Sequence, residues 1–133
     1  MDVAILLALL LHRPAGLVST IYDVAGIEGV AICEYESQFN DHACRREYEG
    51  TSWGLFQLWS KYHEQHREDL LLHIVAGTAY WTECKEKAGG DIAKGYSVYN
   101  SGNTRHSIEK GREVERLRDF LARRVAEAVG VNL

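Results

Sequence analysis

The sequence of 133 residues is poor in proline and cysteine. One proline and 12 glycines exclude a collagen-like chain and a proline-rich linker. Three cysteines are too few for a disulfide scaffold, and because three is odd, at least one thiol has no partner within the chain. Neither the G-x-G-x-x-G pattern of dinucleotide sites nor the G-x-S-x-G pattern of α/β-hydrolases occurs. A formal net charge of −4 argues against a protein that binds nucleic acid through a phosphate-neutralising face.

Long apolar runs are also missing. The run over residues 3–11 has nine residues, far fewer than the roughly 20 that span a bilayer, so no stable membrane span is expected. Its length suits the hydrophobic region of a signal peptide, but the residue before it is acidic and no A-x-A cleavage site follows. We therefore expect residues 1–17 to form a short core helix that ends near Pro14, with a signal segment as the alternative.

The chain carries no internal repeat or low-complexity linker, which predicts a single domain over residues 1–133. Apolar residues at helical spacing predict helices in several segments, which are 3–11, 18–25, 30–36, 69–87, a short one after Asp91, and 108–128. By contrast, two glycines and short alternations favour a loop or small hairpin over residues 40–58. The expected fold class is α+β, predominantly α, with one irregular insertion of the kind that commonly carries function.

Glu36 lies at the expected end of an apolar helix, in the acidic half of the chain. Residues 1–60 hold three Lys/Arg against eight Asp/Glu, whereas the remainder holds 12 against 11. At the end of a buried helix, a carboxyl group meets a low dielectric and the negative pole of the helix dipole, and both raise its pKa. A carboxyl group that is protonated at neutral pH can act as the general acid for a leaving alkoxide. The alternative is that Glu36 merely ends the helix and points into water.

Three short motifs follow one another along the chain, and they are Glu36-Ser37-Gln38-Phe39-Asn40, Gly54-Leu55-Phe56-Gln57 and Tyr99-Asn100-Ser101-Gly102. In this order and with these gaps, the motifs resemble the lysozyme-like superfamily, most closely its soluble lytic transglycosylases. The resemblance covers residues 21–125 and includes features of the goose-type and chicken-type lysozymes. It implies a lysozyme-like fold in which the small hairpin or loop insertion forms one side of a saccharide groove.

The resemblance implies a role for each matching residue. Glu36 corresponds to the acid/base, Ser37 to a neighbour that hydrogen-bonds close to it, and Gln57 to a groove residue that contacts the acetamido sugar. Tyr99 corresponds to the hydroxyl that orients the catalytic carboxyl, and Asn100 accompanies it. Three aromatic side chains close together are expected to stack on sugar rings, with core packing as the alternative for each, and they are Trp53, Phe56 and Trp59.

The chain departs from the chicken-type pattern at the second carboxylate. Ser52 stands where that family carries its second catalytic Asp, and serine cannot act as the carboxylate nucleophile of a retaining glycosidase. Glu49 lies close to the acidic position of the goose-type loop and is the main candidate for a second carboxylate, while Glu47 and Asp41 are weaker ones. With one assured carboxyl group, we expect lytic transglycosylation, in which Glu36 acts first as acid and then as base to give a 1,6-anhydromuramoyl product.

Two other functions stay open, namely a hydrolytic muramidase that uses Glu36 with Glu49, and a non-catalytic glycan-binding relative. No cofactor is expected, and no metal either, because His63 and His66 are three residues apart rather than the four of H-E-x-x-H. The expected partner is the glycan strand of peptidoglycan, and the expected state is a monomer. We expect the protein to act on the cell wall, which it would reach by export or as a phage-encoded protein. The sequence leaves open the pairing of the cysteines, which are Cys33, Cys44 and Cys84.

Overall fold

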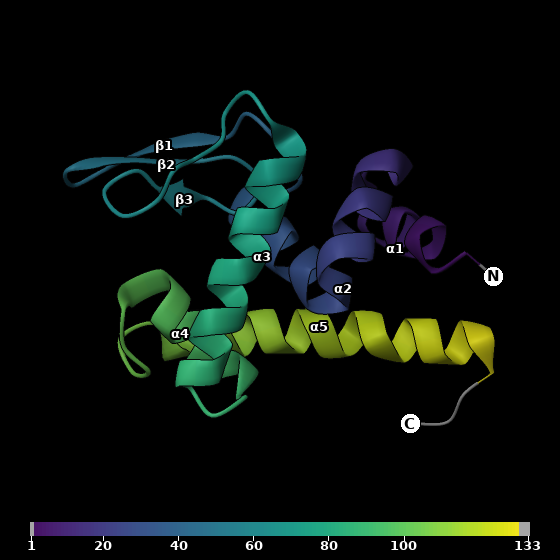
Figure 1. Cartoon of the computed structure of the whole chain (residues 1–133). Helices are drawn as coiled ribbons and strands as arrows, with labels where there is room; N and C mark the ends of the chain where they lie inside the picture. The colour runs from purple at the N-terminus through teal and green to yellow at the C-terminus, as the bar shows by residue number, and fades with distance from the viewer. Residues whose placement is uncertain (1, 131–133) are drawn as a thin grey trace.

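The structure is a computed structural model that describes residues 2–130, so the ends of the expected domain, residue 1 and residues 131–133, lie outside the described residues. Its elements are, in chain order, α1 (Val3–Leu11), α2 (Ala15–Ser37), β1 (Cys44–Glu47), β2 (Gly50–Trp53), β3 (Leu58–Trp59), α3 (Leu70–Lys87), α4 (Ile92–Ser101) and α5 (Ile108–Val129). Figure 1 shows the small sheet at one end of the molecule and α5 as a long helix that crosses the lower part of the view behind α4. The expectation of an α+β fold that is predominantly α is confirmed.

Aspartate residues mark the start of three of the helices. Asp2, Asp69 and Asp91 stand directly before α1, α3 and α4, and each side chain accepts a hydrogen bond from the backbone N–H three residues later. Such caps satisfy an N–H group that has no partner within its own helix. The helices expected after Asp69 and Asp91 therefore begin where the sequence predicted.

The catalytic candidate Glu36 lies near the end of α2, which is interrupted once. Gly26 has φ +66° and ψ −165°, a backbone conformation that glycine adopts without the steric cost of a side chain. This break separates the helices that the sequence predicted over 18–25 and 30–36. The second part of α2 is a core helix, because residues 30–33 are fully buried. It ends at Ser37, and Gln38 in the left-handed conformation closes it.

By length and composition, α2 is also the one helix among residues 2–130 that could cross a membrane. Buried core helices and N-terminal signal segments meet the same criterion, which makes it weak evidence for a span. Residues 2–130 therefore offer at most one candidate span, and a weak one.

The three strands form one antiparallel sheet in the order β1-β2-β3. In the hairpin of β1 and β2, Cys44 lies opposite Trp53, and Glu47 lies opposite Gly50. The short β3 then pairs with the end of β2, so that the chain turns back through residues 54–57. The hairpin predicted within residues 40–58 is confirmed, and it carries the residues that face the end of α2.

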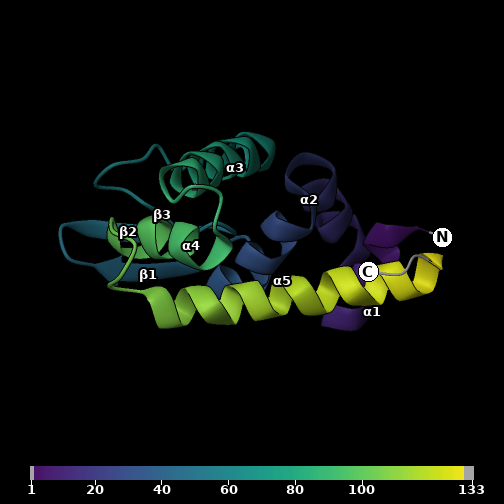
Figure 2. The ribbon, with the colours of Figure 1, turned by 90° about the horizontal axis from the view of Figure 1, so that it is seen from below.

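Close backbone packing joins α4 to α5 (Figure 2). A Cβ atom on Gly111 would lie 2.0 Å from the carbonyl oxygen of Ala93, so no side chain fits between the two helices at this point. Val114 and Leu121 are buried as the apolar periodicity predicted, whereas Ala128 is exposed near the end of α5. This packing fixes α4, whose tyrosines reach the end of α2.

Candidate active site

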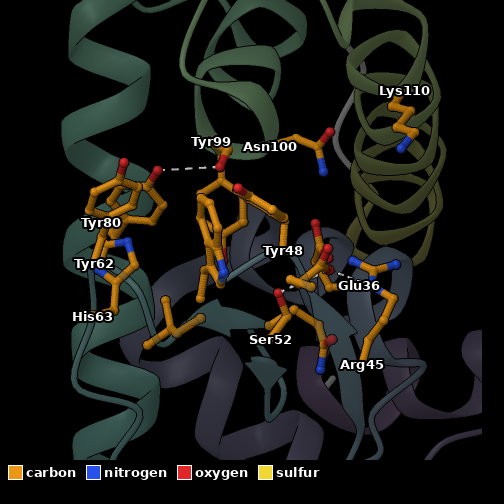
Figure 3. A pocket seen from close by; sticks show the side chains of 14 residues that line it. Glu36, Arg45, Tyr48, Ser52, Tyr62, His63, Tyr80, Tyr99, Asn100 and Lys110 are labelled. Carbon is orange, nitrogen blue, oxygen red and sulfur yellow. Dashed lines mark hydrogen bonds and ion pairs between the residues drawn. The ribbon is translucent and has the colours of Figure 1, made fainter. Parts of the chain in front are cut away.

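A cleft of about 510 Å³ lies between the sheet and the helices, and Glu36 forms part of its wall (Figure 3). Glu36 and Arg45 lie on one side of the view, whereas Tyr62, His63 and Tyr80 lie on the opposite side. The residues that line this cleft are Glu36, Arg45, Glu47, Tyr48, Ser52, Gln57, Leu58, Trp59, Tyr62, His63, Tyr80, Tyr99, Asn100 and Lys110.

Glu36 is an acid that titrates near neutrality. Burial raises the pKa of its carboxyl group to about 7, against the lowering effects of a hydrogen bond from Tyr96 and of the positive charges of Arg45 and Lys110. The negative charge of Glu47 raises this pKa further. At pH 7, about half of the Glu36 side chains therefore carry a proton. Such a group can give a proton to a leaving oxygen and later take one back.

Tyr96 makes the contact with Glu36 that the sequence assigned to Tyr99, and the prediction for Tyr99 is wrong in this respect. The buried Tyr96 hydroxyl donates a hydrogen bond to Oε1 of Glu36. The Tyr99 hydroxyl instead donates to the backbone carbonyl of Phe56. The two tyrosines are three residues apart on α4, and their rings stack with centroids 5.8 Å apart. Both line up toward the end of α2, but only Tyr96 reaches the carboxyl group.

Ser37 and Tyr99 hold the turn of residues 54–57 against the helices. The Ser37 hydroxyl donates to the carbonyl of Leu55 at 2.9 Å, and Tyr99 binds the carbonyl of the next residue, Phe56. Ser37 is buried and is not among the residues that line this cleft, but it lines a smaller adjoining pocket together with Glu36 and Gln57. The two hydroxyl groups thereby fix the distance between Glu36 and the turn.

Gln57 and Asn100 line the cleft as the resemblance implied. The amide nitrogen of Gln57 donates to the carbonyls of Ala43 and Gly54, at 2.9 and 2.8 Å. Because an amide NH₂ has two hydrogens, only the oxygen of this side chain is left for a ligand. Asn100 is exposed, and its oxygen accepts a hydrogen bond from Ser107 at 2.6 Å.

The second carboxylate in the cleft is Glu47, not Glu49 as expected. Glu49 lies at the tip of the hairpin with φ +60°, and its carboxylate pairs with Lys61 outside the cleft. Glu47 lies at the end of β1 and lines the cleft, where it accepts hydrogen bonds from Arg45 at 2.8 Å and Ser52 at 3.2 Å. The difference arises because the chain leaves the strand after Glu47, so the side chain of Glu49 no longer follows the alternation of the strand. The weaker candidate Asp41 is a surface residue whose carboxylate lies 3.8 Å from the ring of its neighbour in sequence, His42.

Only one of the three predicted stacking residues reaches the cleft. Trp59 lines it, whereas Trp53 and Phe56 are core residues with 7% and 0% exposure. Phe56 packs so closely on α3 that a Cβ atom on Gly77 would lie 2.2 Å from its ring.

The sequence analysis missed two tyrosines that line the cleft, Tyr48 and Tyr62, which expose 81% and 68% of their surface. It also missed four further residues of the site, which are Arg45, Tyr80, Tyr96 and Lys110. A large exposed aromatic side chain on a loop is the signal that marks such positions.

The possible metal ligands form no cluster, and the cysteines form no disulfide, in the part of the chain that the structure describes. Within residues 2–130, no three His, Cys, Asp or Glu side chains come together as a metal site. His63 packs on the ring of Tyr80 with centroids 4.2 Å apart and lines the cleft. All three cysteines are free thiols, two of them buried, and they are Cys33, Cys44 and Cys84.

No family model, curated protein or solved structure matches this chain significantly. Its function must therefore be inferred from the geometry of the cleft and from the resemblance of its motifs. The cleft combines a half-protonated carboxyl group, a second carboxylate, two cationic side chains and exposed tyrosines. Acid/base chemistry on a polar, ring-containing ligand fits this combination.

Proposed function

We propose that this chain is a peptidoglycan lytic transglycosylase with a lysozyme-like fold, which cleaves the β-1,4 bond between N-acetylmuramic acid and N-acetylglucosamine. The observation that carries the proposal is the position of Glu36, in a cleft where burial raises its pKa to about 7. All three sequence motifs contribute to the same cleft, through Glu36, Gln57, Tyr99 and Asn100. If the resemblance of the motifs were accidental, there would be no reason for residues so far apart in sequence to line one cleft.

In the first step, protonated Glu36 gives its proton to the glycosidic oxygen, and the bond from this oxygen to C1 of N-acetylmuramic acid breaks. Tyr96 occupies Oε1 of the carboxyl group, so Oε2 is the oxygen that carries the proton toward the sugar. The positive charge that develops at C1 is stabilised by the acetamido oxygen of the same sugar. No second protein carboxylate is needed for this step.

In the second step, the Glu36 carboxylate accepts the proton of the 6-hydroxyl group of N-acetylmuramic acid. The 6-oxygen forms a bond to C1, which closes the 1,6-anhydro ring and releases the acetamido oxygen. Glu36 is then protonated again, and no water is consumed. A pKa of about 7 suits both steps, because the group must lose and regain a proton at neutral pH.

Charged groups in the cleft favour this substrate despite the negative net charge of the chain. Peptidoglycan carries carboxylates on its peptide groups, and a net charge of −4 repels it at long range. Arg45 and Lys110 place positive charge next to Glu36, on β1 and α5. Because Arg45 pairs with Glu47, Lys110 is the cleft cation that supplies positive charge for the substrate.

Hydrolysis is the second candidate function, and the position of Glu47 favours it. A hydrolytic muramidase needs a second carboxylate on the other side of the bond, to activate water or to form a covalent intermediate. Glu47 lines the same cleft as Glu36 and is close enough to influence its pKa. In this case the product would carry a reducing end instead of an anhydro ring.

Mass spectrometry of the muropeptides released from purified sacculi tests the proposal. We expect products lighter by one water than the reducing forms, and we expect none from the Glu36→Gln variant. Products with reducing ends would contradict the transglycosylase proposal and support the hydrolase that uses Glu47. Binding of glycan strands without any released product would point to the non-catalytic relative.

A further inference from the structure

His73 is a fully buried polar residue in the core helix α3, and both nitrogen atoms of its ring have partners. Nδ1 lies 2.8 Å from the backbone carbonyl oxygen of Gln65, and Nε2 lies 3.1 Å from the backbone nitrogen of Phe56. A carbonyl oxygen can only accept, and a backbone N–H can only donate. The partners therefore fix the ring as the neutral tautomer with its hydrogen on Nδ1.

Through this ring, α3 holds the turn that lines the cleft. The peptide groups of Phe56 are bound on both sides, since His73 accepts from its N–H and Tyr99 donates to its carbonyl. His73 also lies against Gly54, where an added Cβ atom would come within 2.5 Å of the ring. The residue after Phe56 is Gln57, which forms part of the cleft wall. A loss of the hydrogen bond between His73 and Phe56 would therefore act on the cleft wall through the next residue, Gln57.

Protonation of His73 is incompatible with this arrangement. A second N–H on Nε2 would face the N–H of Phe56, and the buried backbone donor would lose its acceptor. The other groups around the ring supply no negative charge: the rings of Trp53 and Phe56 lie 5.3 and 6.1 Å away, and the nearby ionisable groups, His66 and Arg67, are bases. Burial and His66 accordingly lower the pKa of His73, against the raising effect of the Gln65 carbonyl.

We propose that His73 is a positioning residue of the cleft, which holds the turn of residues 54–57 as long as its ring is neutral and releases it when the ring is protonated. The acid side of the activity profile is then set by His73 and not by Glu36, which is already protonated there. The claim about the ring is independent of the proposed function, whereas its effect on turnover rests on that function.

The ring itself is tested by NMR on the ¹⁵N-labelled wild-type chain, with no substrate and no variant. We expect His73, among the six histidines, to show hydrogen on Nδ1 only, and to titrate below the ordinary histidine range. The Phe56 amide signal should move together with the His73 ring as the pH falls. Hydrogen on Nε2, or an ordinary titration that leaves the Phe56 amide unchanged, would overturn the proposal.

A variant that accepts a hydrogen bond but cannot be protonated tests the effect on turnover. The His73→Gln variant offers an amide oxygen to the Phe56 N–H at every pH, and the His12→Gln variant, which changes the exposed histidine that directly follows α1, is the matched control. For wild type and control we expect sacculus lysis to fall about tenfold as the pH drops through the titration of His73, and for His73→Gln to fall less than about threefold. An unchanged acid limb in His73→Gln would overturn the role of His73. Absence of lysis in all three chains would refute the proposed function and leave the NMR result to decide on the ring.

Discussion

The two sides of the cleft are built in different ways. On the helical side, the half-buried Glu36 is held by a hydrogen bond from Tyr96, which is itself buried. On the hairpin side, Arg45 and Tyr48 are largely exposed, and Glu47 is bound by side chains of its own sheet. The helical side therefore supplies one proton-carrying group with a displaced pKa, and the hairpin side supplies charge and aromatic surface.

This difference follows from what each task requires. A general acid at neutral pH needs a desolvated carboxyl group in one fixed orientation, which packed helices can provide. Binding of a long polymer needs groups that reach out of the surface, which a three-stranded sheet with a projecting hairpin tip can provide. Changes on the helical side should therefore affect turnover and pH dependence, whereas changes on the hairpin side should affect binding.

The largest effect is expected from Glu36→Gln. Loss of the group that we propose gives and takes the proton should lower lysis by about 10³-fold, while glycan binding is largely retained. Initial rates of sacculus clearing, together with binding to intact sacculi, measure both. The matched control is Glu49→Gln, because Glu49 lies outside the cleft and should keep rates within about twofold of wild type. Lysis by Glu36→Gln at the wild-type rate would refute the role of Glu36.

The same variant should be more stable than wild type at neutral pH. The pKa of Glu36 is about 7 in the folded chain and lies near its ordinary value in the unfolded chain. The free energy of unfolding is therefore highest below about pH 4.5, where Glu36 is protonated in both the folded and the unfolded chain, and it declines as the pH rises toward 7. Glutamine has no such proton to lose, so Glu36→Gln should gain on the order of 1–3 kcal/mol at pH 8 and almost nothing at pH 4. Urea unfolding at the two pH values checks this, and an equal gain at both would contradict the account.

The next effect separates the two neighbouring tyrosines. Tyr96→Phe removes a hydrogen bond that lowers the pKa of Glu36, so the alkaline limb of activity should move to higher pH and the rate should fall about tenfold. Tyr99→Phe should leave the alkaline limb in place and cost about 1 kcal/mol of stability, because its bond goes to the turn. pH–rate profiles and thermal unfolding of both variants distinguish the roles. If Tyr99→Phe moved the alkaline limb and Tyr96→Phe did not, Tyr99 would be the residue that orients Glu36, as the sequence predicted.

A smaller effect is expected on the hairpin side from Glu47→Gln. For a transglycosylase, the rate should change less than about fivefold, and the alkaline limb should move to slightly lower pH because the charge of Glu47 raises the pKa of Glu36. For a hydrolase, loss of the second carboxylate should cost about 10²-fold or more. Rates and released products measured together decide between these outcomes.

The smallest effect is expected from Tyr48→Ala at the hairpin tip. Loss of one exposed aromatic contact should raise KM about three- to tenfold and leave kcat unchanged. Kinetics with soluble glycan fragments give the two constants separately. A fall in kcat with unchanged KM would mean that Tyr48 affects turnover, and it would contradict the division between a helical side for turnover and a hairpin side for binding.

The sequence predicted the helices and the hairpin well because local signals define them. Asp69 and Asp91 cap their helices, and Gly26 separates the two predicted parts of α2. Glu36 could be selected because an apolar segment ends there and known motifs surround it. The caps and the glycine lie within a few residues of the feature that they predict, whereas two of the motifs that point to Glu36 lie far along the chain, at residues 54–57 and 99–102.

The details of the site could not be predicted because they depend on how the elements are rotated against each other. Tyr96 and Tyr99 lie on one face of α4, and only the packing of α4 on α5 decides which hydroxyl reaches Glu36. Likewise, Glu47 and Glu49 differ because the strand ends between them, and no Asn-Gly or Asp-Gly pair marks that turn. His73 gave no local signal, since its partners lie 8 and 17 residues away.

The titration of Glu36 tests the central claim most directly. In ¹³C NMR of the carboxyl carbons, with Glu36→Gln used to assign the signal, Glu36 should titrate with a pKa of about 7. The same signal in Tyr96→Phe should titrate at higher pH than in the wild type. A wild-type pKa near the ordinary glutamate value of about 4.3 would contradict the claim that the cleft keeps this acid protonated at neutral pH.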